Sequence, residues 1–138
     1  TVRKTEVTLA ENAKLNVMEK LMTHDSQTAV SDMTVELNGA GSSAQIVSRS
    51  VGKGNSVQTF HPIAVGNALC HAHVQCDSII MDKARISSIP EIDARNIDAQ
   101  IIHEAAIGKI AGEQIIKLMT LGLTEEEAEA VIIEDFLA

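Results

Sequence analysis

One pattern of a strand followed by a turn recurs through most of the chain. It is clearest in Ala44-Gln45-Ile46-Val47-Ser48-Arg49-Ser50-Val51, followed by Gly52-Lys53-Gly54-Asn55. A short run that mixes aliphatic and small polar residues is typical of a strand, and the glycines and asparagine after it are typical of a turn. Similar runs, separated by Gly, Asn, Asp or Ser, recur up to about residue 108. They cover 14–22, 33–37, 57–65, 69–81, 84–89 and 97–107. The pattern predicts a mainly β body.

The composition narrows the choice of β architecture. Hydrophobic residues make up 45% of the 138 residues, but the chain has two Phe and no Trp or Tyr. A core of small aliphatic residues suits a solenoid, in which each coil buries its face only against the next coil. A sandwich or barrel is the alternative, although only Asn38-Gly39 resembles a tight hairpin turn. The pattern alone leaves both architectures open.

The end of the chain is helical in pattern. The segment from Gly112 to Leu121 carries apolar residues at helical spacing, and Gly122 follows as a candidate C-cap. Thr124 and Glu127 then have the spacing of a capping box. We therefore expect helices at 112–121 and 124–137. The expected apolar stripe of the second helix comprises Ala128, Val131, Ile132 and Phe136.

Charge, hydropathy and cysteine usage argue against nucleic-acid-binding, membrane-spanning and disulfide-bonded secreted proteins. The formal net charge of −8 argues against a nucleic-acid partner, because phosphate binding needs a basic surface. No apolar run approaches the roughly 18 residues that a membrane span needs. Cys70 and Cys76 are too far apart for a CxxC site, and we expect them to be free thiols in the cytoplasm. The chain begins with Thr1 rather than Met, which favours a fragment or a processed protein.

Several segments, in order, resemble the SufB/SufD family of the SUF system. Each motif alone is weak, but together they span roughly the last hundred residues in the spacing of the family. The segments are Gly41-Ser42-Ser43-Ala44-Gln45-Ile46-Val47-Ser48-Arg49-Ser50-Val51, His73-Val74-Gln75-Cys76-Asp77-Ser78-Ile79-Ile80, Ile89-Pro90-Glu91-Ile92, His103-Glu104-Ala105-Ala106-Ile107-Gly108-Lys109-Ile110 and Gly122-Leu123-Thr124-Glu125-Glu126-Glu127-Ala128.

The resemblance implies a fold and a function. The fold would be a right-handed parallel β-helix at 1–108, followed by a C-terminal helical hairpin at 109–138 that docks a SufC-type ABC ATPase. The function would be that of a scaffold component without enzymatic activity in a SufBCD-type complex, carrying a transient, nascent iron–sulfur cluster. The implied partners are a SufB/SufD-type chain, or a second identical chain, and a cysteine desulfurase as sulfur donor.

Cys76 is the first candidate site residue. It matches the family's Cys-Asp-Ser cysteine, which receives sulfur or ligates the nascent cluster, and thiolate is the usual ligand for iron in such clusters. Cys70, Ala72, Val74 and Cys76 alternate with polar residues, so they share one strand face. The competing interpretation is that Cys76 is a small core residue.

His103 and Glu104 match the family's His-Glu-Ala motif, and the resemblance implies that both lie close to the nascent cluster and support its assembly. The glutamate favours a SufB-like or homodimeric type. The alternatives are a half-buried histidine on an apolar strand face and a solvated surface carboxylate. His71 and His73 are two residues apart on one strand face, a spacing that can chelate a metal, although surface histidines are the commoner outcome. Of the two, His73 is the better candidate, because a His-x-x-Cys segment recurs in the family.

Three positions depart from the family pattern in its ATPase-docking half: Lys117, Leu121 and Asp135. They leave the identity and affinity of the ATPase partner open.

Two other functional classes compete with the scaffold. The first is a β-helix enzyme. A polysaccharide lyase would need paired carboxylates or a Lys/Arg cluster, and an acyltransferase would need a strict hexapeptide period. The sequence shows neither pattern. A non-catalytic β-solenoid that only mediates interactions, without cluster chemistry, is the second.

Overall fold

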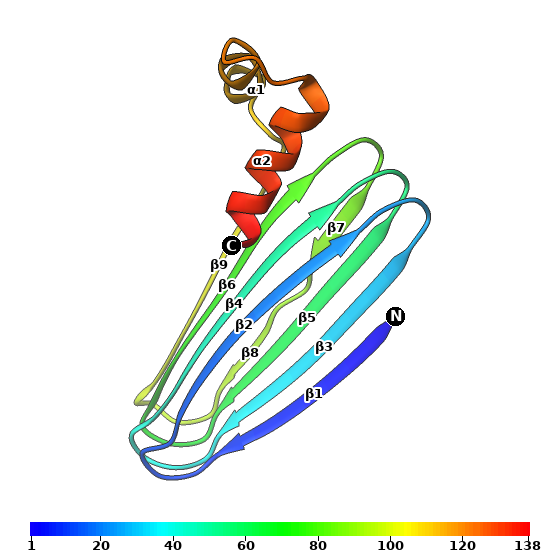
Figure 1. The fold of residues 1–138 in the computed structure, drawn as a ribbon. Helices are drawn as coiled ribbons and strands as arrows, with labels where there is room; N and C mark the ends of the chain where they lie inside the picture. The colour runs from blue at the N-terminus through cyan, green and yellow to red at the C-terminus, as the bar shows by residue number, and fades with distance from the viewer.

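In the computed structural model, which describes all of residues 1–138, the chain winds into a flattened coil of two facing sheets (Figure 1). Every pair of neighbouring strands is parallel. The predicted parallel β-solenoid is therefore confirmed, and the sandwich alternative is wrong. Sheet A contains β1 (Val2–Leu9), β3 (Thr28–Leu37), β5 (Val57–Gly66), β7 (Arg85–Ser88) and β8 (Glu91–Ala94). Sheet B contains β2 (Lys14–Thr23), β4 (Ser42–Gly52), β6 (Cys70–Ile80) and β9 (Ala99–Gly108).

Each coil of the solenoid contains 28 or 29 residues. Val2 pairs with Val30, 28 positions later, and Lys14 pairs with Ser43, 29 positions later. The change of one residue is absorbed in the turns, so the strands stay in register. No repeated motif marks this period, which is why the sequence pattern alone did not separate a solenoid from a sandwich.

The turns at one end of the coil stack on one another through their backbones. Asp25, Gly54 and Asp82 occupy equivalent positions in three successive turns and all have positive φ, at 52°, 64° and 56°. The N–H of Asn55 donates to the carbonyl of Asp25 at 2.8 Å, and the N–H of Lys83 donates to that of Gly54 at 2.9 Å. Asp tolerates the left-handed conformation better than most residues, so each turn can repeat the shape of the one below it.

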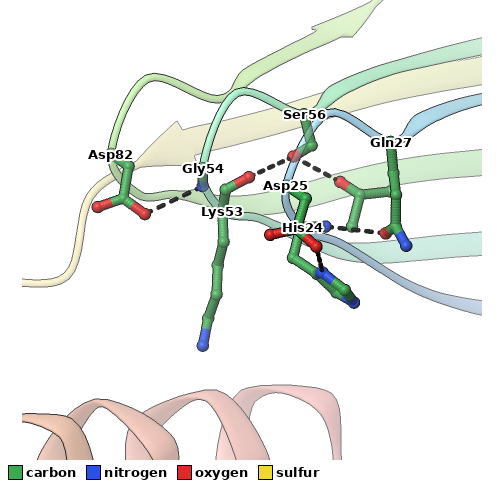
Figure 2. A network of polar contacts seen from close by, with 8 residues as sticks. His24, Asp25, Gln27, Lys53, Gly54, Ser56 and Asp82 are labelled. Carbon is green, nitrogen blue, oxygen red and sulfur yellow. Dashed lines mark hydrogen bonds and ion pairs between the residues drawn. The ribbon is translucent and has the colours of Figure 1, made fainter.

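Side chains tie these turns together as well (Figure 2). The N–H of Gly54 donates to the Asp82 carboxylate at 3.0 Å. The Ser56 hydroxyl donates to the Lys53 carbonyl at 2.7 Å and accepts from the Thr23 hydroxyl at 2.9 Å. Because Thr23 and Ser56 are buried, these bonds satisfy polar groups that would otherwise be costly inside the fold.

The lumen between the sheets is apolar at one end of the strands and polar at the other. Leu37, Ala44 and Val74 fill the apolar end. At the other end, the Ser50 and Ser78 hydroxyls lie 2.7 Å apart, and they line an internal cavity of ≈ 10 Å³. The buried carboxylate of Glu19 is satisfied there by Arg3 and by the Ser31 hydroxyl. Cys76 lies at the boundary between the two halves.

Two helices follow the solenoid: α1 (Gly112–Met119) and α2 (Glu125–Leu137). The predicted capping box of Thr124 and Glu127 is present in both directions. The buried residues of α2 are Ala128 and Ile133, whereas Val131 from the expected stripe is 45% exposed. The expected stripe is therefore wrong in part. Neither helix is long and apolar enough to cross a membrane.

Arg49 fixes the end of α2 to the outer face of sheet B. Its guanidinium lies 3.5 Å from the carbonyl oxygens of Phe136 and Ala138. The last turn of α2 has no basic residue of its own, so Arg49 supplies the positive charge that the helix C-terminus favours. The solenoid thus holds the helical segment at a defined place (Figure 1).

The bounds differ from the sequence expectation in several places, and β3 in particular begins at Thr28 rather than at residue 33. The first helix ends at Met119, and Gly122 adopts a φ of 98° three residues later, after a short turn. The strand β8 was not expected, because Glu91–Ala94 is only four residues long and all four residues are exposed. It forms because β5 offers it a free edge.

A substitution at Gly39 tests how tightly the turns must stack. A Cβ atom at Gly39 would lie 2.0 Å from the backbone nitrogen of Glu11 in the turn of the preceding coil. Gly39→Ala should therefore lower the free energy of unfolding by about 1–3 kcal/mol. Gly112→Ala is the matched control, because a Cβ there meets nothing within 4 Å. Urea unfolding midpoints that coincide for Gly39→Ala and the parent would contradict this account of the turns.

Candidate functional site

Cys76 points into the lumen from β6, where it is 3% exposed. Cys70, six residues earlier on the same strand face, is also buried, as the alternation predicted. Both cysteines are free. They differ in their surroundings, because Cys70 lies among apolar side chains while Cys76 borders the polar half of the lumen.

His103 projects into the lumen from β9, the last strand of sheet B. Its register partner on β6 is Val74, so the imidazole lies on the same face as Cys76, one diagonal step away. The His103 Nε2 atom is 3.7 Å from the Cys76 Sγ atom. No further strand pairs with β9, so the imidazole is only partly buried at an open end of the solenoid. The structure thus brings two of the predicted site residues together.

A third group reaches the thiol from the opposite sheet. The hydroxyl of Ser88, the last residue of β7, donates to Cys76 Sγ at 3.4 Å. The sequence analysis missed Ser88, since no pattern in the chain shows which residues of one sheet face a given residue of the other. The register of Ser88 with Phe60, an inward-facing residue, is the structural reason for its position.

The surroundings keep both groups of the thiol–imidazole pair neutral. Burial raises the pKa of Cys76 above its ordinary value; the Ser88 hydrogen bond opposes this rise, and the charge of Asp77 adds to it. Burial lowers the pKa of His103, and the nearby His73 lowers it further. Without a bound metal, the pair is therefore a thiol and a neutral imidazole rather than a thiolate and an imidazolium.

The separation of the pair fits two ligands of one metal ion. Tetrahedral ligands with bonds of about 2.3 Å to sulfur and 2.0–2.1 Å to nitrogen lie about 3.6 Å apart. The observed 3.7 Å between Sγ and Nε2 agrees with this value. No group of three or more His, Cys, Asp or Glu side chains in the chain is arranged to hold a metal ion. The pair can thus supply half of a tetrahedral site.

Glu104 and His73 lie on the outer face of the same sheet, away from Cys76. The Glu104 Oε2 atom is 3.4 Å from His73 Nε2, and the Glu104 side chain is 64% exposed. The His-Glu motif therefore splits across the sheet, because neighbouring residues of a strand face opposite sides. His71, on the same outer face as His73, is exposed.

The three positions that depart from the family pattern meet in one place. Lys117, Leu121 and Asp135 all line a groove of ≈ 800 Å³ between α1 and α2. Leu121 is 78% exposed at the end of this groove. The departures therefore change one surface rather than three unrelated positions.

Comparison with known proteins identifies the family of the chain. The family described as "SUF system FeS cluster assembly, SufBD core domain" matches residues 1–136. An iron–sulfur cluster assembly SufBD family protein of Methanothermobacter thermautotrophicus is 38% identical over 106 residues, covering 75% of this chain and 26% of the relative. One from Archaeoglobus fulgidus is 37% identical over 102 residues, covering 73% and 28%. One from Mycobacterium tuberculosis is 33% identical over 99 residues, covering 69% and 12%.

The chain thus spans about a quarter of the length of the two archaeal relatives. The family match extends over both sheets and both helices, and it includes Cys76 and His103. The chain belongs to the SufBD core-domain family of iron–sulfur cluster assembly proteins.

Proposed function

We propose that the open end of this solenoid is a place where a nascent iron–sulfur cluster, the cargo of the system, is held while it is assembled. Cys76 would accept sulfur or ligate iron through its thiolate, and His103 would be the second ligand. The observation that carries the proposal is the Sγ–Nε2 separation of 3.7 Å at an open end of the lumen. Thiolate and imidazole are both established iron ligands.

The neutral state of the pair suits loading and release. A neutral imidazole has its lone pair free for a metal, so His103 needs no deprotonation before binding. The thiol of Cys76 must lose its proton when it ligates, which makes metal binding release a proton. Because this chain supplies two ligands, a partner or the cargo itself must complete the coordination, and this incomplete coordination would help the cluster to leave.

In this proposal, Glu104 and His73 bind iron at a second place, outside the lumen. Their side chains lie on the outer face of sheet B, and their atoms are 3.4 Å apart. Carboxylate and imidazole suit a ferrous ion better than they suit a sulfide-bridged cluster. Within this proposal they hold iron briefly on the outer surface, beside the strand that carries His103.

The partners follow from two exposed surfaces. The free edge of β9 and the exposed Ile97 and Ile102 near it would pair with a SufB/SufD-type chain or a second copy. The groove between α1 and α2 would dock the SufC-type ATPase, while a cysteine desulfurase would supply sulfur to Cys76. The chain itself would act as a cytoplasmic scaffold rather than an enzyme.

One observation favours a second candidate function. Cys76 is 3% exposed and burial raises its pKa, as expected for an inert core thiol. In that case the chain would be an interaction module without cluster chemistry. The first experiment below separates the two functions.

Cys76→Ser distinguishes a ligand from a core thiol. If Cys76 is a ligand, anaerobic reconstitution with iron and sulfide should give a several-fold lower cluster absorbance near 400 nm per folded chain. If Cys76 is only a core residue, the substitution should cost about 1–3 kcal/mol of stability, and loading should fall only with folding. His103→Ala should weaken loading less, because imidazole is the more replaceable ligand.

Cys70→Ser is the internal control for this experiment. Cys70 is 5% exposed on the same strand face as Cys76, but His103 and Ser88 hydrogen-bond only to Cys76. Loading of Cys70→Ser should therefore match the parent. Equal iron and sulfide content in the parent and Cys76→Ser would remove Cys76 from cluster chemistry.

The pH dependence of metal binding tests the protonation states. The raised pKa of Cys76 leaves a thiol at neutral pH, and the lowered pKa of His103 leaves a neutral imidazole. Binding of Co²⁺ should then release one proton, so its apparent association constant should rise about tenfold per pH unit between about pH 7 and 8. An association constant that is flat across this range would show that the thiol does not ligate.

The groove between the helices can be tested without removing a helix. Leu121→Glu places a charge at a position that is 78% exposed, so the fold should persist while co-purification with the SufC-type subunit is lost. Val2→Glu is the control for added surface charge, because Val2 is 74% exposed and lies in β1, outside the groove and in the first coil, whereas β9 is in the last coil. Deletion of residues 125–138 should have the same effect as Leu121→Glu. Retained co-purification in both variants would place the ATPase elsewhere.

A further inference from the structure

Ser88 is the one hydroxyl that donates to Cys76, and it comes from the opposite side of the lumen. Its Oγ atom lies 3.4 Å from Cys76 Sγ, while His103 Nε2 lies 3.7 Å from the same sulfur. The sulfur is thus held between a donor from sheet A and an imidazole from sheet B. The Ser88 hydroxyl has no other hydrogen-bond partner, so its contact with sulfur does not compete with a second role.

The backbone around Ser88 is fixed where sheet A is interrupted. The N–H of the next residue, Ile89, donates to the Phe60 carbonyl at 2.8 Å. Pro90 then follows, and its missing N–H ends the pairing that began with β7. This break leaves Ser88 as the last paired residue of β7, facing the lumen opposite Cys76.

The other serines of the lumen serve a different purpose. Ser50 and Ser78 lie 2.7 Å apart and satisfy each other. Ser48 is the direct register partner of Cys76 on β4, yet it makes no hydrogen bond to the thiol. Ser88 differs from these serines, because its only hydrogen-bond partner is a sulfur atom. Removal of the Ser88 hydroxyl would therefore leave no other hydroxyl group of the lumen without a partner.

We propose that Ser88 is a positioning residue for Cys76: its hydroxyl holds the sulfur in the orientation that faces His103 and remains bound to it when it carries metal. This role rests on the proposed function of Cys76 as a ligand. A hydrogen bond to a ligating sulfur withdraws electron density from it, which is one way in which proteins tune iron–sulfur sites. Ser88 would thus set both the direction and the donor strength of the thiolate.

The first test needs no metal. In the reduced, metal-free chain labelled with [¹³C]cysteine, Ser88→Ala should move the Cys76 Cβ signal, because the side chain then samples other rotamers. The Cys70 signal should stay in place and serves as the control within the same molecule. Ser88→Thr, which keeps the hydroxyl, should restore the parent spectrum. A Cys76 signal that is unchanged in Ser88→Ala would overturn the proposal.

The second test uses Co²⁺ as the probe. In Ser88→Ala the sulfur-to-cobalt charge-transfer band should move to longer wavelength. Co²⁺ should bind about five-fold more weakly, because the hydrogen bond to the thiolate in the loaded site is stronger than the one to the neutral thiol in the free chain. Ser87→Ala is the matched control, because Ser87 is exposed and makes no hydrogen bond to the thiol. Identical band positions and affinities in Ser88→Ala and the parent would contradict the role of Ser88 in the loaded site.

A different measurement shows whether the proposed function of Cys76 is wrong. If Cys76→Ser keeps the cobalt band, Cys76 is not a ligand, whatever Ser88 does. The cysteine spectra then still decide whether Ser88 positions the thiol in the free chain.

Discussion

The stacking of turns of nearly equal length is the constraint on which the rest of the structure depends. A parallel coil can pair its strands only if each turn returns the chain to the same height and direction. Asp25, Gly54 and Asp82 achieve this by adopting the same left-handed conformation one above another, with backbone hydrogen bonds between successive turns. A clash at one turn would shift the register of the strands on both sides of it, and with it every inward-facing residue.

Register in turn decides which residues can meet. With the strands aligned, every second residue of β6 and β9 faces the lumen, so Cys76 and His103 meet although 27 residues separate them. The same alternation sends Glu104 to the outer face, where it meets His73 instead. The two halves of the His-Glu motif are therefore available to different chemistry on opposite sides of one sheet.

The sequence predicted the fold class, the helices and the shared face of Cys70 and Cys76 because periodicity and capping are local signals. The choice of solenoid over sandwich came from the resemblance, since coils of 28 and 29 residues without a repeated motif leave no clear period. Ser88 was missed because contacts across the lumen depend on how one sheet faces the other. The resemblance implied that His103 and Glu104 both belong to the cluster site, but neighbouring residues of a strand face opposite sides, so only His103 reaches Cys76.

The burial of Cys76 and its proposed role as a ligand are compatible on physical grounds. An ionised thiolate–imidazolium pair in the lumen would need solvation that the partly buried site does not supply, so the pair is neutral in the absence of metal. A metal cation reverses this balance, because its charge compensates the thiolate and its bond replaces the lost proton. The thiol would then be inert until metal arrives, and it would return to its neutral form when the cargo leaves. A fully exposed thiolate would have the reverse properties, since it would react with oxidants whether or not metal were present.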